Sequence, residues 1–330
     1  MAKGYNATEY MYSSARIRAL ETKMATREDI LRFCDMDNSG AIVQMLSEYG
    51  FDNEDSALSR EDMLTGVLER GFEDVLSMEC AYAVKFLQYQ YDCNNIKAIL
   101  KCNARGISYV DMLLPLGSVS IDKAIEAFEN RDYSAYPSAM AEAIVSAQEA
   151  FVATANPQKI DFIIDRACFC DMLAAANDCG INLAKRLAEA KIDLVNIMQT
   201  VRLLRMKLGE QSSALLDEAY IEGGTLDKDC LLNAFSDMDG FLSEIIRSKY
   251  YSLAQMISDG DELGQIEKTV DNIYLDIAKE AKTVPFGAEV AIGYIFALEY
   301  EIKNIRIILA SKDAGLPTEV IRERLRDCYV

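Results

Sequence analysis

The feature that most constrains this chain is a five-residue motif, acid-x-x-Asn-Ile, that occurs three times. The three copies are centred on the pairs Asp92 and Asn95, Asp193 and Asn196, and Glu301 and Asn304. The asparagines lie 101 and 108 residues apart, and a glycine follows each of them after 11 to 13 residues. Recurrence at this spacing predicts a chain built from three similar modules.

Apolar residues continue the repeat on both sides of the motif. In every copy they recur with the same steps of four, three, four, three and four residues. The stripes begin at Tyr82, Leu183 and Ala291 and end at Leu100, Val201 and Leu309. Such steps place the residues on one face of a long amphipathic helix. With only 5 prolines in 330 residues, the sequence predicts an all-α fold.

A second repeated motif lies between the first ones. Gly117-Ser118 and Gly224-Thr225 are each followed ten residues later by a phenylalanine, Phe128 or Phe235, and Phe33 stands in a related segment near the N-terminus. Glycine turns separate helical segments. We therefore predict helical modules at 1–117, 118–224 and 225–330, with Phe33, Phe128 and Phe235 at equivalent core positions.

The acid and the asparagine of the first motif lie three residues apart, so they are neighbours on a helix. Together they could hold a neighbouring helix end, or they could form a ligand site. Threefold recurrence favours a structural clamp, because a catalytic site is seldom built three times in one chain.

Several functions are disfavoured by the sequence. The chain has no histidine and a net charge of −19, and none of the three modules is basic; this argues against nucleic-acid binding. The 9 cysteines include no CxxC pair, no phosphate-binding GxxxxGK[ST] loop occurs, and no run of about 18 apolar residues could span a membrane. We expect no cofactor, no metal and no catalytic residue.

The chain resembles a known family along essentially its whole length, most specifically in its C-terminal third. The residues that carry the resemblance are Gly293 to Leu309, Gly315-Leu316-Pro317 and Ile321 to Leu325, with looser matches at 15–21, 114–118, 160–162 and 165–167. They are similar to the C-subunit family of V-type and A-type ATPases, the bacterial and archaeal relatives of the vacuolar ATPase d subunit. One departure is Met198, because the other copies have Lys97 and Arg306 after Asn-Ile.

The resemblance implies three similar helical domains around a pseudo-threefold axis, forming a funnel. It also implies a non-catalytic central-stalk subunit, peripheral to the cytoplasmic face of the cell membrane. Such a subunit would join the central axle (D/F-type subunits) to the membrane rotor ring and transmit torque between ATP turnover and H⁺ or Na⁺ transport. Two alternatives are an unrelated helical-repeat scaffold or adaptor and an all-α enzyme that uses paired acids with Mg²⁺, although the latter needs a DDxxD-like motif that the chain lacks.

Overall fold

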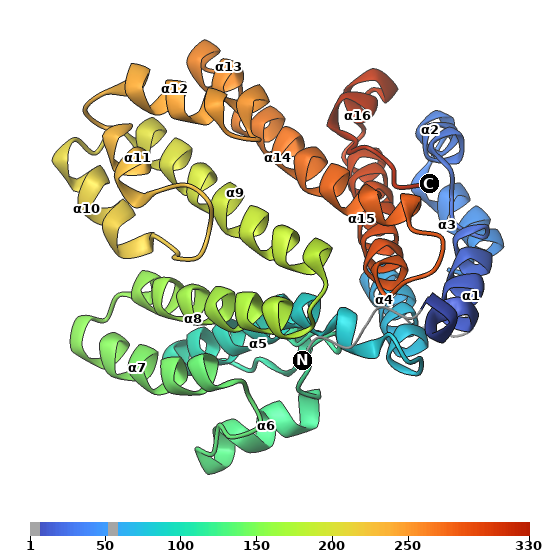
Figure 1. The fold of residues 1–330 in the computed structure, drawn as a ribbon, viewed down its shortest axis with the longest axis horizontal. Helices are drawn as coiled ribbons and strands as arrows, with labels where there is room; N and C mark the ends of the chain where they lie inside the picture. Colours follow the sequence, from blue (N-terminus) through green and yellow to red (C-terminus); the bar gives the residue numbers. More distant parts are fainter. Residues whose placement is uncertain (1–6, 52–58) are drawn as a thin grey trace. The chain divides into compact units, whose positions relative to one another are not determined.

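The computed structural model describes residues 7–51 and 59–330, which form sixteen α-helices, five short 3-10 helices and no β-strand (Figure 1). The all-α prediction is confirmed for these residues. None of the helices in these two ranges is both long enough and apolar enough to cross a membrane.

The chain divides into two compact units. Unit 1 comprises residues 1–84 and 259–330, and unit 2 comprises residues 85–258. This division follows compactness rather than the sequence repeat, so the boundaries of the three modules stay a prediction.

Unit 1 is built around one long helix, α15 (Glu289–Asp313), which has buried residues along nearly its whole length. Helices α1, α2, α3, α4, α14 and α16 all contact it. The bounds are η1 Ala7–Tyr10, α1 Met11–Glu21, α2 Arg27–Asp35, α3 Ser39–Leu46, η2 Ser47–Tyr49, α4 Arg60–Leu76, η3 Ala81–Ala83, α14 Leu263–Ala278, η5 Lys279–Thr283 and α16 Thr318–Arg324.

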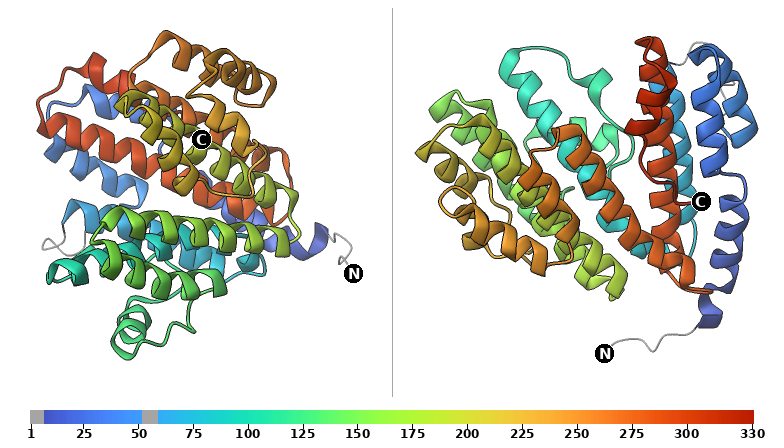
Figure 2. Two further views of the ribbon diagram at one scale, coloured as in Figure 1. Left: turned by 90° about the vertical axis from the view of Figure 1, so that its left-hand side faces the viewer. Right: turned by 90° about the horizontal axis from the view of Figure 1, so that it is seen from above.

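Unit 2 has a central helix, α8, that packs against α5 and α9 and forms a hairpin with α7, as Figure 2 shows for the paired α7 and α8. Helices α10 and α11 contact α9, and α12 contacts α11. The bounds are α5 Lys85–Arg105, η4 Val110–Met112, α6 Ile121–Asn130, α7 Ser138–Thr154, α8 Pro157–Asp178, α9 Asn182–Met206, α10 Glu210–Ala219, α11 Lys228–Asn233, α12 Met238–Arg247 and α13 Tyr251–Asp259.

The three apolar stripes lie on α5, α9 and α15. Every stripe residue is buried except Tyr82. Tyr82 lies before α5, in η3, where 43% of it is exposed and its hydroxyl is 2.7 Å from that of Tyr10. Periodicity therefore identified the core helices but extended the first stripe by one residue.

Glycines end two of these helices in the same way. Gly106 and Gly315 have φ values of 66° and 68°, a backbone conformation that costs glycine little. At both ends the next residue, Ile107 or Leu316, donates its N–H to a carbonyl five residues earlier. This pairing satisfies carbonyls that the helix leaves free and fixes where the chain leaves α5 and α15.

Candidate functional site

The three repeated asparagines make the same contact with the backbone. Each side chain is buried, donates from Nδ2 to the carbonyl of one downstream residue and accepts that residue's N–H on Oδ1. The pairs are Asn95 with Leu114, Asn196 with Ile221, and Asn304 with Arg326, with distances between 2.8 and 3.1 Å. Each asparagine thus ties the segment that follows its helix back along that helix.

The repeated aspartates hold the second motif. The Asp92 carboxylate accepts the N–H of Ser118 at 3.0 Å, its hydroxyl at 2.6 Å, and the N–H of Val119 at 3.1 Å. Asp193 makes the same three contacts with Thr225 and Leu226, at 2.6 to 3.0 Å. The two motifs found separately in the sequence are therefore each other's partners.

The glycine before each hydroxyl residue leaves room for this contact. A Cβ added at Gly117 would overlap the Asp92 carboxylate, and one added at Gly224 would overlap that of Asp193. Neither glycine has a positive φ, so the requirement is steric rather than conformational.

Glu301 occupies the third acid position but accepts fewer hydrogen bonds than Asp92 and Asp193 do. Its carboxylate accepts one hydrogen bond, from the N–H of Ala25 at 2.6 Å, directly before Thr26, the N-cap residue of α2. The pKa of Glu301 is raised to about 8, mainly by burial and to a smaller extent by nearby Asp29, against the lowering effect of the Ala25 N–H. The third acid thus holds the start of α2 as a carboxyl group that is protonated at neutral pH.

A basic network fixes the C-terminal segment in unit 1. Burial alone would raise the pKa of Asp271, but Lys303 at 2.9 Å and Arg326 at 2.8 Å hold it below its usual value. Arg326 is also the residue whose backbone Asn304 binds. Two independent contacts therefore anchor the segment after α16.

The basic residue that follows Asn-Ile forms an ion pair in both copies that have one. Lys97 on α5 pairs with Asp165 on α8 at 2.6 Å, and Arg306 on α15 pairs with Glu61 on α4 at 2.9 Å. Met198, which replaces it in α9, is buried. The sequence departure therefore removes an ion pair without exposing an apolar side chain.

The three phenylalanines are not equally buried, and their equivalence in the three modules stays a prediction. Phe33, on α2, is fully buried, but Phe128 on α6 and Phe235 just after α11 are half-buried. At the latter two sites the preceding alanine, Ala127 or Ala234, is the buried residue.

We expect Phe235→Ala to lower the free energy of unfolding by about 1–2 kcal/mol, below the 3–5 kcal/mol typical of a fully buried phenylalanine. Partial exposure reduces the apolar area that the substitution returns to water. Urea unfolding monitored by circular dichroism measures the change, and a loss above about 4 kcal/mol would show that the ring is a core residue.

Asn95→Ala tests the asparagine contact. The variant leaves the N–H and carbonyl of Leu114 without their partner, so we expect a loss of about 2–3 kcal/mol. Asn103→Ala is the matched control, because Asn103 is exposed on the same helix and should change stability by less than about 0.5 kcal/mol. Equal effects of the two substitutions in urea unfolding would refute the clamp.

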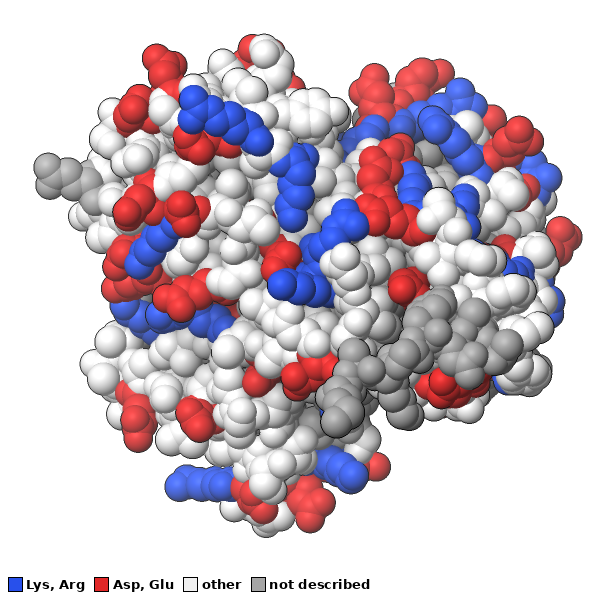
Figure 3. All heavy atoms as spheres, viewed as in Figure 1, with Lys and Arg blue, Asp and Glu red and all other residues white. Residues whose placement is uncertain are grey.

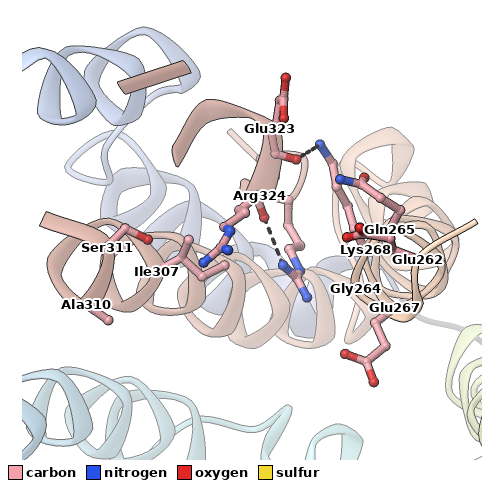
Figure 4. A pocket seen from close by; sticks show the side chains of 11 residues that line it. Glu262, Gly264, Gln265, Glu267, Lys268, Ile307, Ala310, Ser311, Glu323 and Arg324 are labelled. Atoms are coloured by element: carbon pink, nitrogen blue, oxygen red, sulfur yellow. Dashed lines mark hydrogen bonds between the residues drawn. The ribbon is translucent and has the colours of Figure 1, made fainter. Parts of the chain in front are cut away.

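One pocket of about 390 Å³ lies in unit 1 between α14, α15 and the segment from 323 to 326 (Figure 4). Its lining mixes acidic and basic side chains. Lys268 donates to the carbonyl of Glu323 at 2.7 Å and Arg326 to that of Arg324 at 2.8 Å. These groups bind the chain's own backbone, and no cluster of three metal-ligating side chains occurs in residues 7–51 and 59–330.

Unit 1 carries an exposed apolar surface near the start of α15. It consists of Met11, Tyr12, Leu76, Tyr82 and Phe286, which are between 38% and 69% exposed. Arg16 pairs with Asp74, Arg18 donates to the carbonyl of Val284, and the Tyr10 and Tyr82 hydroxyls touch. These contacts bring α1, the end of α4, η3 and the segment before α15 together as one surface, which we call the unit 1 apolar surface.

Unit 2 carries a second exposed apolar surface at the C-terminal ends of α5, α7 and α9. Its six residues are 36% to 86% exposed: Ile107, Val110, Met112, Val152, Met206 and Leu208. Lys101 pairs with Asp161 at 2.5 Å and Lys159 with Glu218 at 2.6 Å, so the first turns of α8 join the end of α5 to α10, which packs on α9. Periodicity could not locate this unit 2 apolar surface, because it consists of helix ends and turns.

The sequence comparisons decide the family. Residues 13–324 match the family model described as ATP synthase (C/AC39) subunit. The chain belongs to this family. It is the C-type member of an A/V-type ATPase, a non-catalytic part of the stalk. This membership sets aside the unrelated scaffold and the paired-acid enzyme.

The relatives are similar along most of their length. The C subunit of an A-type ATP synthase from Haloquadratum walsbyi is 25% identical, covering 94% of this chain and 96% of the relative. That of Methanosarcina barkeri is 23% identical, covering 98% and 94%. The C subunit of a V-type sodium ATPase from Enterococcus hirae is 23% identical over 73% of each chain.

Proposed function

We propose that this protein is the socket that joins the central axle of its ATPase to the membrane rotor ring. In this role it transmits torque between ATP hydrolysis or synthesis and the transport of H⁺ or Na⁺. Its partners would be the axle subunits of D/F type and the ring subunits, and it would lie peripherally on the cytoplasmic face of the cell membrane. Family membership and the names of the relatives support the assignment.

The observation that carries the proposal is the pair of apolar surfaces. Exposed side chains such as Tyr12, at 69%, and Val152, at 86%, are grouped with other large apolar residues rather than scattered. Grouped exposure of this kind marks sites of protein or membrane contact. A joint needs two such contacts, one for each of the elements that it connects.

We also propose that the chain is a cyclic repeat of the three modules 1–117, 118–224 and 225–330, arranged as a funnel about a pseudo-threefold axis. Asp92 and Asp193 each hold the start of the module that follows, at Ser118 and Thr225. Glu301, in the last module, holds Ala25 in the first. A repeat in which the last copy holds the first is what closure of a ring requires.

Buried clamps suit a part that carries load. The repeated asparagines and aspartates each link a long helix to a later segment through two or more hydrogen bonds, and satisfied buried networks are rigid. Torque applied at one end of such a helix would reach the neighbouring module with little local unfolding.

Copurification of the assembled complex tests the socket. Tyr12→Asp and Val110→Asp each place a charge within one apolar surface, and both side chains are exposed, so the isolated protein should fold. We expect each variant to lose one partner, axle or ring, while it keeps the other. Retention of both partners by both variants would refute the two-contact proposal.

A further inference from the structure

The unit 2 apolar surface differs from the unit 1 apolar surface in charge. The segments that form it, 101–112, 152–161 and 202–210, contain six basic and three acidic residues. The segments around the unit 1 apolar surface, 9–18, 73–82 and 280–289, contain three basic and six acidic ones. Lys101 and Lys159 are paired with acidic residues, which leaves four basic and two acidic residues in these segments. In a chain with a net charge of −19, such a basic excess beside an apolar surface is unusual.

Part of this charge has a local explanation. Arg105 and Arg205 lie in the last turns of α5 and α9, where basic side chains interact favourably with the helix dipole. Lys207, however, lies beyond the end of α9. Arg105 and Lys207 are exposed and have no ion-pair partner among the residues that the structure describes.

The helix dipole does not explain the apolar side chains beside these charges. Val152 is 86% exposed, Met206 59% and Met112 55%. The end of the α7–α8 hairpin, at the left of Figure 1, is largely free of charged atoms in Figure 3. Exposed aliphatic side chains next to lysine and arginine are the combination that binds anionic lipid surfaces, through partial insertion and charge attraction together.

We propose that the unit 2 apolar surface faces the membrane and binds anionic lipid headgroups, with Val110, Val152 and Met206 reaching below them and with Arg105 and Lys207 contacting the phosphates. The inference rests on the proposed membrane-side position of the protein and assigns that position to one end of unit 2. It places the rotor ring and the lipid around it at the unit 2 apolar surface, and it leaves the acidic unit 1 apolar surface for the axle.

Sedimentation with lipid vesicles tests the proposal on the full-length protein. Vesicles of phosphatidylglycerol mixed with phosphatidylcholine should carry the protein down, and vesicles of phosphatidylcholine alone should not. Val110→Asp combined with Val152→Asp should weaken binding by about tenfold or more, since each loses an inserted apolar side chain. Arg105→Glu combined with Lys207→Glu should weaken it to a similar extent, and added salt should do the same.

Tyr12→Asp is the control, because it places a negative charge on an exposed residue of the unit 1 apolar surface and should leave binding unchanged. The proposal is wrong if anionic vesicles do not bind the protein, or if Tyr12→Asp weakens binding as much as the unit 2 variants do. It is also wrong if only vesicles that contain the rotor ring bind, because the partner is then protein. If the native protein does not bind anionic vesicles but still supports coupled transport in the assembled complex, only this inference is refuted. If it does neither, the socket role is refuted as well.

Discussion

Asp193→Ala should lower the free energy of unfolding by about 3–5 kcal/mol, because it leaves several buried donors without an acceptor. The Asp193 carboxylate is fully buried and accepts hydrogen bonds from the N–H groups of Thr225 and Leu226. It also accepts the hydroxyls of Thr225 and Tyr250, at 2.6 and 2.7 Å. Alanine offers none of these contacts and is too short for another group to replace them.

Urea unfolding measures this loss, and Glu189→Ala is its matched control. Glu189 lies on the same helix, where it makes an i,i+4 pair with Lys185 at 3.6 Å, so its replacement should cost less than about 0.5 kcal/mol. An Asp193→Ala variant as stable as the control would mean that the contact does not stabilise the fold.

The stability of the protein should fall as pH rises from 5 to 9, and Glu301 should account for much of the fall. Its folded-state pKa of about 8 lies above the ordinary value of 4.5, so the folded state binds a proton more tightly than the unfolded state. This contribution is fully present below pH 4.5 and is lost as pH rises through 8. The difference corresponds to about 5 kcal/mol between the two limits.

Glu301→Gln should remove this pH dependence. Glutamine keeps a carbonyl oxygen for the Ala25 N–H but cannot ionise, so the variant should be more stable than the native chain above pH 8. Urea unfolding at pH 6, 7, 8 and 9 measures the crossover. Glu319→Gln, at an exposed site, should reproduce the native profile. If Glu301→Gln shows that same profile, Glu301 is not the titrating group.

The long helices and two of the clamps could be predicted from the sequence because they follow from periodicity and recurrence. The stripes on α5, α9 and α15 are buried as their steps indicate. Both Asp92 and Ser118 belong to repeated motifs, so the pair could have been inferred by asking which repeated polar groups lack a partner.

The Glu301 contact could not be found in this way. Its partner is a backbone N–H, that of Ala25, and the segment has neither the glycine nor the adjacent hydroxyl contact that mark Gly117-Ser118 and Gly224-Thr225. A contact to a backbone N–H does not require a particular side chain at the donor residue, so the sequence gives no sign of it.

The partial exposure of Phe128 and Phe235 could not be predicted from the sequence either. At both sites the preceding alanine is the buried residue, and a repeated residue type does not specify which of two adjacent apolar side chains faces the core. The apolar surfaces could not be predicted for a related reason. Periodicity distinguishes the faces of a helix, whereas Ile107 and Leu208 lie in turns beyond the helix ends, where no period applies.

The central claim is that this protein joins the axle to the ring, and the ratio of ions transported to ATP hydrolysed tests it most directly. The complex is reconstituted in vesicles with the protein, without it, and with the protein added back, and both rates are measured in each preparation. We predict that omission abolishes ATP-driven transport while hydrolysis continues, and that adding the protein back restores the ratio. A complex that lacks the protein and still transports ions at the normal ratio would contradict the account.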